Sequence, residues 1–144
     1  INKHKMATIN ATVSIGSDIM SYATNISKTM TMKKAGTTTG LNLTTGLSSK
    51  RYTATTQVVL QTYNDVAVTS GGANKVYIRN TGSDKAEFFK VTLADATDAV
   101  EEIGRLYGGD WMLMPWEAAS ADHNIYVQPS TAEVMTLEFM IFFE

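Results

Sequence analysis

The chain is marked by what it has little of. Among its 144 residues there is no cysteine, there are two prolines, and no apolar run approaches the roughly 20 residues of a membrane-spanning helix. Without cysteine the chain can form neither a disulfide framework nor a thiolate metal site. Its fold must therefore depend on a hydrophobic core, and a chain of this length can bury about 68–70% of its unfolded surface.

Aromatic residues, proline and charge are distributed unevenly along the chain. Residues 1–70 contain no tryptophan, phenylalanine or proline, whereas residues 71–144 contain both tryptophans, all five phenylalanines and both prolines. The first stretch carries seven basic and two acidic side chains, and the second carries five basic and twelve acidic ones. This opposition predicts a compact acidic module with a polar, basic extension that binds a partner.

Alternating apolar and polar residues predict strands in the first half of the chain. Residues 9–15 alternate in this way and stop at Gly16, as a half-buried strand does. Residues 20–32 also place their large side chains on one parity. The hydroxyl-bearing residues between them favour an extended strand or arm over a helix.

The next segment is rich in threonine and glycine. Residues 35–50 repeat Thr-Thr-Gly twice, and the glycines at 36, 40 and 46 predict turns or a flexible ribbon. Such a segment cannot bury enough surface alone to offset its ordering entropy, so it needs neighbours to pack on. We therefore assign residues 1–50 to an extended Thr-rich basic arm and residues 51–144 to a β-domain whose densest core lies in 74–144.

Short strands at close spacing fill the second half of the chain. The stretch at 75–79 is expected to form a hairpin with the one at 87–93, and residues 98–106 a short helix with a capping box. In the stretch at 133–143 both parities are apolar, which predicts a central strand or one covered by a neighbouring subunit. Turns at such short intervals predict an all-β fold, a β-sandwich or jelly-roll-like module. Further strands are expected at 52–63, 111–116 and 124–128.

Side chains that could carry catalysis or bind a metal are few. His123 beside Asp122 could act as a general base, but no cysteine or Gly-x-Ser-x-Gly turn accompanies it, so a solvated loop is expected. The glycine pair at 71–72 lacks the following Lys-Ser/Thr of a phosphate-binding loop. We therefore expect a non-enzymatic protein with no catalytic residue, metal or cofactor. One acidic group lacks the ligand spacing of a calcium loop and is interpreted as a solvated turn and helix cap: Asp95, Asp98, Glu101 and Glu102.

A basic and apolar set along the arm is the first candidate interaction surface. Its lysines could contact nucleic-acid phosphates, but the acidic module behind the arm would repel a duplex. Docking on an acidic protein surface, including a second copy of this chain, fits the charge pattern better. The arm residues expected to make such contacts are Met20, Tyr22, Ile26, Lys28, Met30, Met32, Lys33 and Lys34.

The segment between the two tryptophans is the second candidate surface. If Trp111, Trp116 and Tyr107 stood exposed on a sandwich, they could stack on sugar rings, and the module would bind a host glycan. In the other, favoured interpretation the parity of Trp111 and Leu113 packs in the core, and the opposite parity covers a subunit contact. Tryptophan and methionine are both enriched at interface cores. The residues assigned to this surface are Tyr107, Trp111, Met112, Met114 and Trp116.

The second half also contains a recurring set of short motifs. One strand ends in Asn80-Thr81-Gly82, and a Gly-Gly-Asp turn at 108–110 leads into an apolar segment that ends at Pro115. An Ile-Tyr-Val strand follows at 125–127. Over residues 74–144 this arrangement resembles small β-sandwich virion proteins of tailed bacteriophages, among them capsid decoration (cement) proteins.

That resemblance implies a structural role without a catalytic residue. The chain would be a decoration subunit on the capsid surface of the virion, where it would bind the major capsid protein and stabilise the shell. A homotrimer is expected by analogy, since such subunits close around a symmetry axis. Within the same class, a head–tail or fibre component of the virion is the alternative. Outside it, the alternative is a carbohydrate-binding module.

Overall fold

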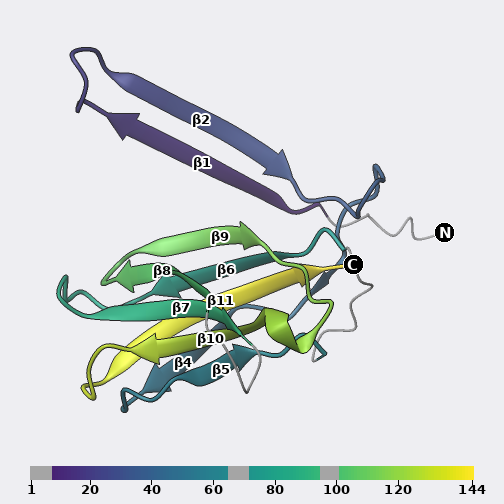
Figure 1. Cartoon of the computed structure of the whole chain (residues 1–144). Helices are drawn as coiled ribbons and strands as arrows, with labels where there is room; N and C mark the ends of the chain where they lie inside the picture. The colour runs from purple at the N-terminus through teal and green to yellow at the C-terminus, as the bar shows by residue number, and fades with distance from the viewer. Residues whose placement is uncertain (1–7, 65–71, 95–100) are drawn as a thin grey trace.

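The chain is an all-β protein. The computed structural model describes residues 8–64, 72–94 and 101–144, and within these ranges it contains eleven strands, one short 3₁₀ helix and no α-helix. Nine of the strands form two sheets that pack face to face, and the other two form a hairpin that stands apart from them (Figure 1). The structure thus confirms the expected β-sandwich.

The larger sheet is built around β11. This strand pairs antiparallel with β6 on one side and with β4 and β3 on the other, and β9 pairs with β6. Because β11 has neighbours on both sides it is a central strand, which its two apolar faces allow. The five strands are β3 (Leu43–Thr44), β4 (Ser48–Tyr52), β6 (Lys75–Asn80), β9 (Trp111–Pro115) and β11 (Met135–Phe143).

The smaller sheet supplies the opposite wall of the sandwich. Its strand order is β5-β10-β7-β8, and all its pairings are antiparallel. A 3₁₀ helix at Ala121–His123 leads into β10. The four strands are β5 (Val58–Gln61), β7 (Phe88–Ala94), β8 (Glu101–Tyr107) and β10 (Asn124–Pro129).

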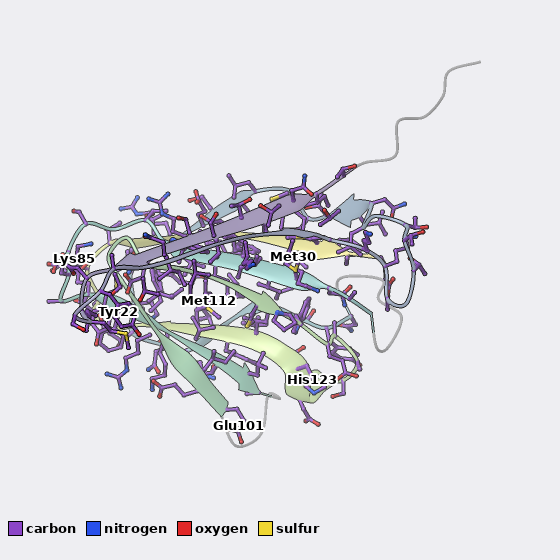
Figure 2. All side chains as sticks on the ribbon, turned by 90° about the horizontal axis from the view of Figure 1, so that it is seen from above. Tyr22, Met30, Lys85, Glu101, Met112 and His123 are labelled. Atoms are coloured by element: carbon purple, nitrogen blue, oxygen red, sulfur yellow. The ribbon has the colours of Figure 1, made fainter. Side chains whose placement is uncertain are left out.

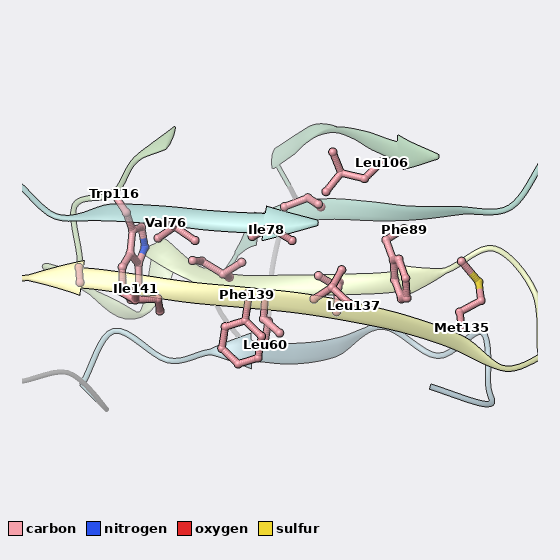
Figure 3. Close-up of a cluster of buried hydrophobic side chains, with 14 residues drawn as sticks. Leu60, Val76, Ile78, Phe89, Leu106, Trp116, Met135, Leu137, Phe139 and Ile141 are labelled. Atoms are coloured by element: carbon pink, nitrogen blue, oxygen red, sulfur yellow. The ribbon is translucent and has the colours of Figure 1, made fainter. Parts of the chain in front are cut away.

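The two sheets enclose one hydrophobic core (Figure 3). Along β11 every second side chain, from Met135 to Ile141, is buried, which is the pattern of a strand with one face inside. Burial of each large apolar side chain contributes about 1.5–3 kcal/mol, so this layer holds the sheets together. The other core members come from both sheets and from the segment after β9: Leu60, Val76, Ile78, Phe89, Val91, Leu106, Trp116, Ala118, Ile125 and Val127.

The two turn motifs that the sequence singles out are hydrogen-bonded to each other. The Asn80 side chain accepts a bond from the Gly82 amide (2.9 Å) and donates one to the Leu106 carbonyl (2.9 Å). Its main chain donates to the Asp110 carbonyl and accepts from the Gly109 amide, both at 3.0 Å. Gly109 has a φ of 89°, which glycine adopts without steric cost. These motifs therefore serve to fix β6 against the turn between β8 and β9.

The hairpin expected from residues 75–93 is wrong, although both of its strands exist. β6 belongs to the larger sheet and β7 to the smaller one, so the chain crosses from one sheet to the other between them. Val76 and Ile78 of β6 and Phe89 and Val91 of β7 all enter the core. The two strands therefore meet across the core and not edge to edge, and their apolar faces meet there.

The helix expected around residue 101 is also wrong, because this segment is strand β8. It pairs with β7, and the register shifts between the partners of Glu102 and Gly104, which leaves Ile103 as the extra residue of a bulge. The bulge interrupts the alternation along the strand, so Ile103 and Leu106 imitate the spacing of a helical face. The main-chain bonds to β7 decide the conformation.

The sandwich includes residues that the sequence analysis assigned to the arm. Thr44 lies opposite Phe142, and residues 48–52 lie opposite residues 135–139. β3 therefore lies entirely before residue 50, β4 spans that residue, and both strands pair with β11. An edge strand needs main-chain hydrogen bonds more than apolar side chains. For this reason the polar composition of residues 43–50 does not exclude them from the sheet.

Candidate interaction surface

The N-terminal segment forms an antiparallel hairpin with one apolar and one polar face. β1 (Asn10–Ser17) pairs with β2 (Thr24–Thr31), so that Ile15 lies opposite Ile26. Opposite residues share a face, so the apolar face carries Ala11, Val13, Ile15, Ile26, Lys28 and Met30. The other face carries Asn10, Thr12, Ser14, Gly16, Asn25, Ser27, Thr29 and Thr31.

The polar face is tied together by its own side chains. The hydroxyls of Thr12 and Thr29 lie 2.8 Å apart, and Thr31 donates to the side-chain oxygen of Asn10 at 2.9 Å. Such cross-strand pairs stabilise a two-stranded sheet by a few tenths of a kcal/mol to about 1 kcal/mol each. They hold the two strands in register, and the side chains of this face are exposed to solvent.

The base of the hairpin is anchored to the sandwich. Met32 and Leu41 are buried, at 3% and 0% exposure, and the Leu41 amide donates to the Met32 carbonyl at 3.1 Å. The Met32 amide donates in turn to the Ile9 carbonyl at 2.9 Å. The Ala35 amide donates to the carboxylate of Glu144, 3.1 Å away. Met32, expected as a contact residue of the arm, therefore packs inside the molecule.

The apolar face of the hairpin lies above the outer face of the larger sheet. The hairpin base is beside the sheet and its tip is farther away (Figure 1), and from above the hairpin crosses over the sandwich (Figure 2). The space between them is a groove of 210 Å³. We call it the hairpin groove, and it is lined by Ile9, Asn10, Ala11, Thr12, Val13, Met32, Tyr77, Trp111, Leu113 and Phe142.

Toward the hairpin tip the groove gives way to a shallow hollow. Its lining residues, Tyr77, Arg79, Gly109 and Trp111, all belong to the sandwich. Trp111 is 52% exposed there. The Tyr77 hydroxyl donates to a Glu138 carboxylate oxygen at 2.8 Å, and Arg79 lies 3.8 Å from the same oxygen. Partial burial, followed by the hydrogen bond and charge of Glu138, raises the pKa of Tyr77.

The hairpin exposes apolar side chains along its length. At its tip Ile19, Met20 and Tyr22 are 92%, 59% and 67% exposed. Tyr22 lies at the far end of the hairpin from its base (Figure 2). Farther back, Ile26 and Met30 are partly exposed on the apolar face. The arm residues proposed from sequence are thus presented to solvent here, with the exception of Met32. Among the lysines of that set, Lys28 and Lys33 are exposed and Lys34 is half-buried.

Trp116 is a core residue and not a surface contact. It is 2% exposed, and its indole nitrogen donates to the His123 carbonyl at 2.7 Å. The expected assignment of the two parities is wrong as well. Met112 and Met114 pack against the core, while Trp111 and Leu113 point to the hairpin groove. The direction reverses because the pairing of β9 with β6 sets which parity faces inward.

The three aromatic residues proposed as a sugar platform are not brought together. Tyr107 belongs to the smaller sheet and packs against Phe88, with 5.2 Å between ring centroids. Trp111 lies on the outer face of the larger sheet, and Trp116 lies between the sheets. A sugar platform needs several aromatic rings on the same face of a domain. Of the three, only Trp111 lies on the outer face of the larger sheet.

The other sequence candidates do not form a site within the described ranges. His123 is half-buried in the 3₁₀ helix beside the exposed Asp122. In the described part of the chain, no group of histidine, aspartate and glutamate side chains could hold a metal ion, and no helix could cross a bilayer. Asp95 and Asp98 of the acidic group lie outside the described residues.

Sequence reasoning missed the sandwich wall of the groove. Tyr77, Leu113 and Phe142 lie on three different strands, and only the order β11-β6-β9 brings them side by side. Alternation within β6 was the one available signal, since Tyr77 and Arg79 occupy its outward parity. No protein-family model, curated protein or solved structure matches this chain.

Proposed function

We propose that this protein is a non-enzymatic structural subunit of a tailed-phage virion, a capsid decoration protein that binds the major capsid protein and stabilises the shell. The amphipathic hairpin is the observation that supports an assembly role. The motifs over residues 74–144, which resemble small phage β-sandwich proteins, support the virion context. The hairpin is the arm that engages neighbouring subunits, and the sandwich is the body that sits on the capsid surface.

The energetics of the hairpin favour a partner. A two-stranded hairpin is marginally stable in water by itself. The hairpin buries Met32 at its base but leaves Ile15, Ile19 and Ile26 at 53%, 92% and 44% exposure. Each large apolar side chain gains about 1.5–3 kcal/mol on full burial. A neighbouring protein that covers this face therefore gains binding free energy and stiffens the hairpin at the same time.

The charge pattern favours an acidic partner surface. Residues 8–42 contain three lysines, at 28, 33 and 34, and one acidic residue, Asp18. The sandwich carries the excess of acidic side chains. Opposite potentials steer association and fix orientation more than they add affinity. Copies of this chain are therefore suited to bind one another through the hairpin, and a trimer is the closed form we propose.

The test replaces the apolar face of the hairpin and leaves its strands intact. In the double variant Ile15→Asn/Ile26→Asn, one cross-strand pair of the apolar face becomes polar. We expect this variant to lose self-association in light scattering and to stop pelleting with capsid shells that lack decoration protein. The matched control is Ser14→Asn/Ser27→Asn, which changes the adjacent pair on the polar face and is expected to behave as wild type.

The two variants separate assembly from folding. Both pairs lie on the hairpin and outside the sandwich core, so thermal melting of the sandwich should be unchanged in either variant. If the apolar-face variant keeps the wild-type mass and still pellets with shells, the apolar face of the hairpin does not mediate assembly, and the proposed function, which rests on that face, is wrong.

A further inference from the structure

We infer that the hairpin tip of one copy, residues 18–23, enters the mouth of the hairpin groove of a second copy, beside Trp111. The contact is head-to-tail: each copy gives a tip to one neighbour and receives a tip from another. This inference rests on the proposed function, and it names the partner of the hairpin as another copy of this chain.

The tip carries the most exposed large apolar side chain of the described residues. Ile19 is 92% exposed, and Met20 and Tyr22 are 59% and 67% exposed. Three large apolar side chains within four positions are unusual for a turn that remains in water, where small and polar residues predominate. Contiguous exposed apolar groups of this kind mark protein contact sites.

The groove is the matching unfilled surface. Its 210 Å³ is many times the volume that one water molecule requires, and side chains such as Val13, Leu113 and Phe142 make its walls apolar. Trp111 lines both the groove and the open hollow, so it stands at the entrance with half its surface free. Tryptophan is enriched among the few residues that carry most of the binding energy of an interface.

The tip cannot fill the groove of its own chain. The hairpin residues that line the groove run from Ile9 to Val13 and include Met32 at the base. Asp18 lies five positions beyond Val13 along an extended strand, which is roughly 16 Å at about 3.3 Å per residue. The hairpin also leans away from the sheet toward its tip (Figure 1). The tip of one copy can therefore fill only the groove of another copy.

Charge gives the contact a direction. Asp18 is the one acidic residue of the arm, and it begins the tip. Arg79 borders the hollow at the groove entrance, with 46% of its side chain exposed. An incoming tip brings the carboxylate of Asp18 toward this guanidinium. A partly exposed pair of this kind adds little affinity but fixes the register of the contact.

A tip-to-groove contact has a defined outcome for the assembly. Because the two surfaces differ, the contact is heterologous, and a heterologous contact forms a closed ring when the rotation closes and an open filament when it does not. A three-membered ring is the closed form that agrees with the proposed trimer. Two hairpins that met face to face would instead give a dimer and would leave the groove empty.

The experiment uses two variants that each lose one half of the contact. Ile19→Asn/Met20→Asn disables the tip, and Trp111→Ala disables the groove. Leu47→Asn and Val134→Asn are controls of similar exposure, at 63% and 52%, that lie outside the tip and the groove. By light scattering and sedimentation velocity we expect each single-sided variant to associate at least about tenfold more weakly than wild type, and the controls to match wild type.

Mixing the two variants tests the direction of the contact. The tip-disabled copy keeps a groove and the groove-disabled copy keeps a tip, so an equimolar mixture should form dimers and nothing larger. A mixture that stays monomeric overturns the head-to-tail contact, and so does a groove variant with the wild-type mass. If Trp111→Ala fails to fold, Arg79→Asp replaces it. Its loss of association should then be reversed when it is mixed with Asp18→Arg.

The failure of this inference can be distinguished from the failure of the proposed function. If wild-type oligomers form and neither single-sided variant changes their mass, the tip-to-groove contact is wrong and the assembly role remains. If the wild-type chain is monomeric at every concentration and does not pellet with shells, both are wrong.

Discussion

Tyr52, at the end of β4, is a half-buried tyrosine. Its surroundings suit the aromatic ring but offer no partner among the described residues to the hydroxyl. The ring meets Phe89 edge-on, with centroids 5.4 Å apart and an angle of 67° between the planes. Burial raises the pKa of Tyr52 from 10.0 to about 12. Between these two values the unfolded chain ionises while the folded one does not, so stability falls as the pH rises through this window.

We predict that Tyr52→Phe stabilises the protein and flattens its alkaline limb. The substitution keeps the contact with Phe89 and removes a buried hydroxyl that is unpaired among the described residues, which is expected to raise the free energy of unfolding by about 1 kcal/mol at pH 7. Denaturant unfolding between pH 9 and about 12 provides the measurement. Lys75, whose pKa burial lowers, acts in the opposite sense but is present in both proteins. An equal alkaline slope in the two proteins would contradict the role given to Tyr52.

The two tryptophans show where sequence reasoning ends at this scale. A core or interface role for the segment follows from its composition, but not which residue has which role. Every position from Trp111 to Trp116 except Pro115 carries a large apolar side chain, so alternation gives no sign of the inward parity. The register with β6 makes the choice, and it buries Trp116 and exposes Trp111. The apolar residues of the hairpin were easier to identify, because polar neighbours separate them.

At the scale of the elements, the turn between β8 and β9 contains a glycine, Gly108, that lies against the main chain of another segment. A Cβ at Gly108 would overlap the main chain of Asp84, whose carbonyl accepts the Gly108 amide hydrogen bond at 3.2 Å. The Lys85 ammonium donates to the Gly108 carbonyl. The loop at residues 84–85 and the turn between β8 and β9 therefore meet at one residue that has no room for a side chain.

We predict that Gly108→Ala destabilises the sandwich by about 1–3 kcal/mol, because the backbone must shift to admit the methyl group. Gly104→Ala is the control, since a Cβ there meets nothing within 4 Å and the residue does not have a positive φ. The control should be neutral or slightly stabilising. Melting temperatures from differential scanning calorimetry compare the two. Equal values for both variants would mean that the turn yields without cost.

Element positions could be predicted from this sequence, but their partners could not. The expected strands at 75–79, 111–116, 124–128 and 133–143 all exist, because each is rich in apolar residues and has a turn beside it. Alternation predicts which side chains are buried but not which strands pair, so the predicted pairing of β6 with β7 is wrong. A bulge at Ile103 removed the alternation from β8 altogether. Edge strands β3 and β4 contain few apolar residues, so the part of them before residue 51 was assigned to the arm.

At the scale of the whole molecule, the opposite charges on the arm and the sandwich should make the proposed self-association depend on salt. Surface charges more than a Debye length apart are screened, and this length falls from about 14 Å at 0.05 M to about 4 Å at 0.5 M. We predict that the dissociation constant of the wild-type oligomer increases as sodium chloride is raised over this range, so that a higher protein concentration is needed to form it. Sedimentation velocity at several protein concentrations measures the shift. Tighter association at high salt would mean that apolar contacts alone hold the oligomer.

The sequence predicts an arm over residues 1–50 and a β-domain from residue 51, whereas sandwich strands β3 and β4 begin before residue 51. The hairpin and its base occupy residues 9–41, and the described strands of the sandwich lie between Leu43 and Phe143. The groove could not have been foreseen, because it lies between the two parts. It depends on the direction in which the hairpin leaves the sheet, which the packing of Met32 and Leu41 determines.

The central place of β11 in its sheet sets an order of events during synthesis. The hairpin pairs strands that are close in the sequence, and such local contacts form early. The larger sheet cannot close until residue 143 has been added, which at about 5–20 residues per second is on the order of ten seconds later. A nascent chain therefore displays its tip before it has a groove. In the proposed contact, two nascent chains that both lack residue 143 cannot capture one another, because neither has a groove yet.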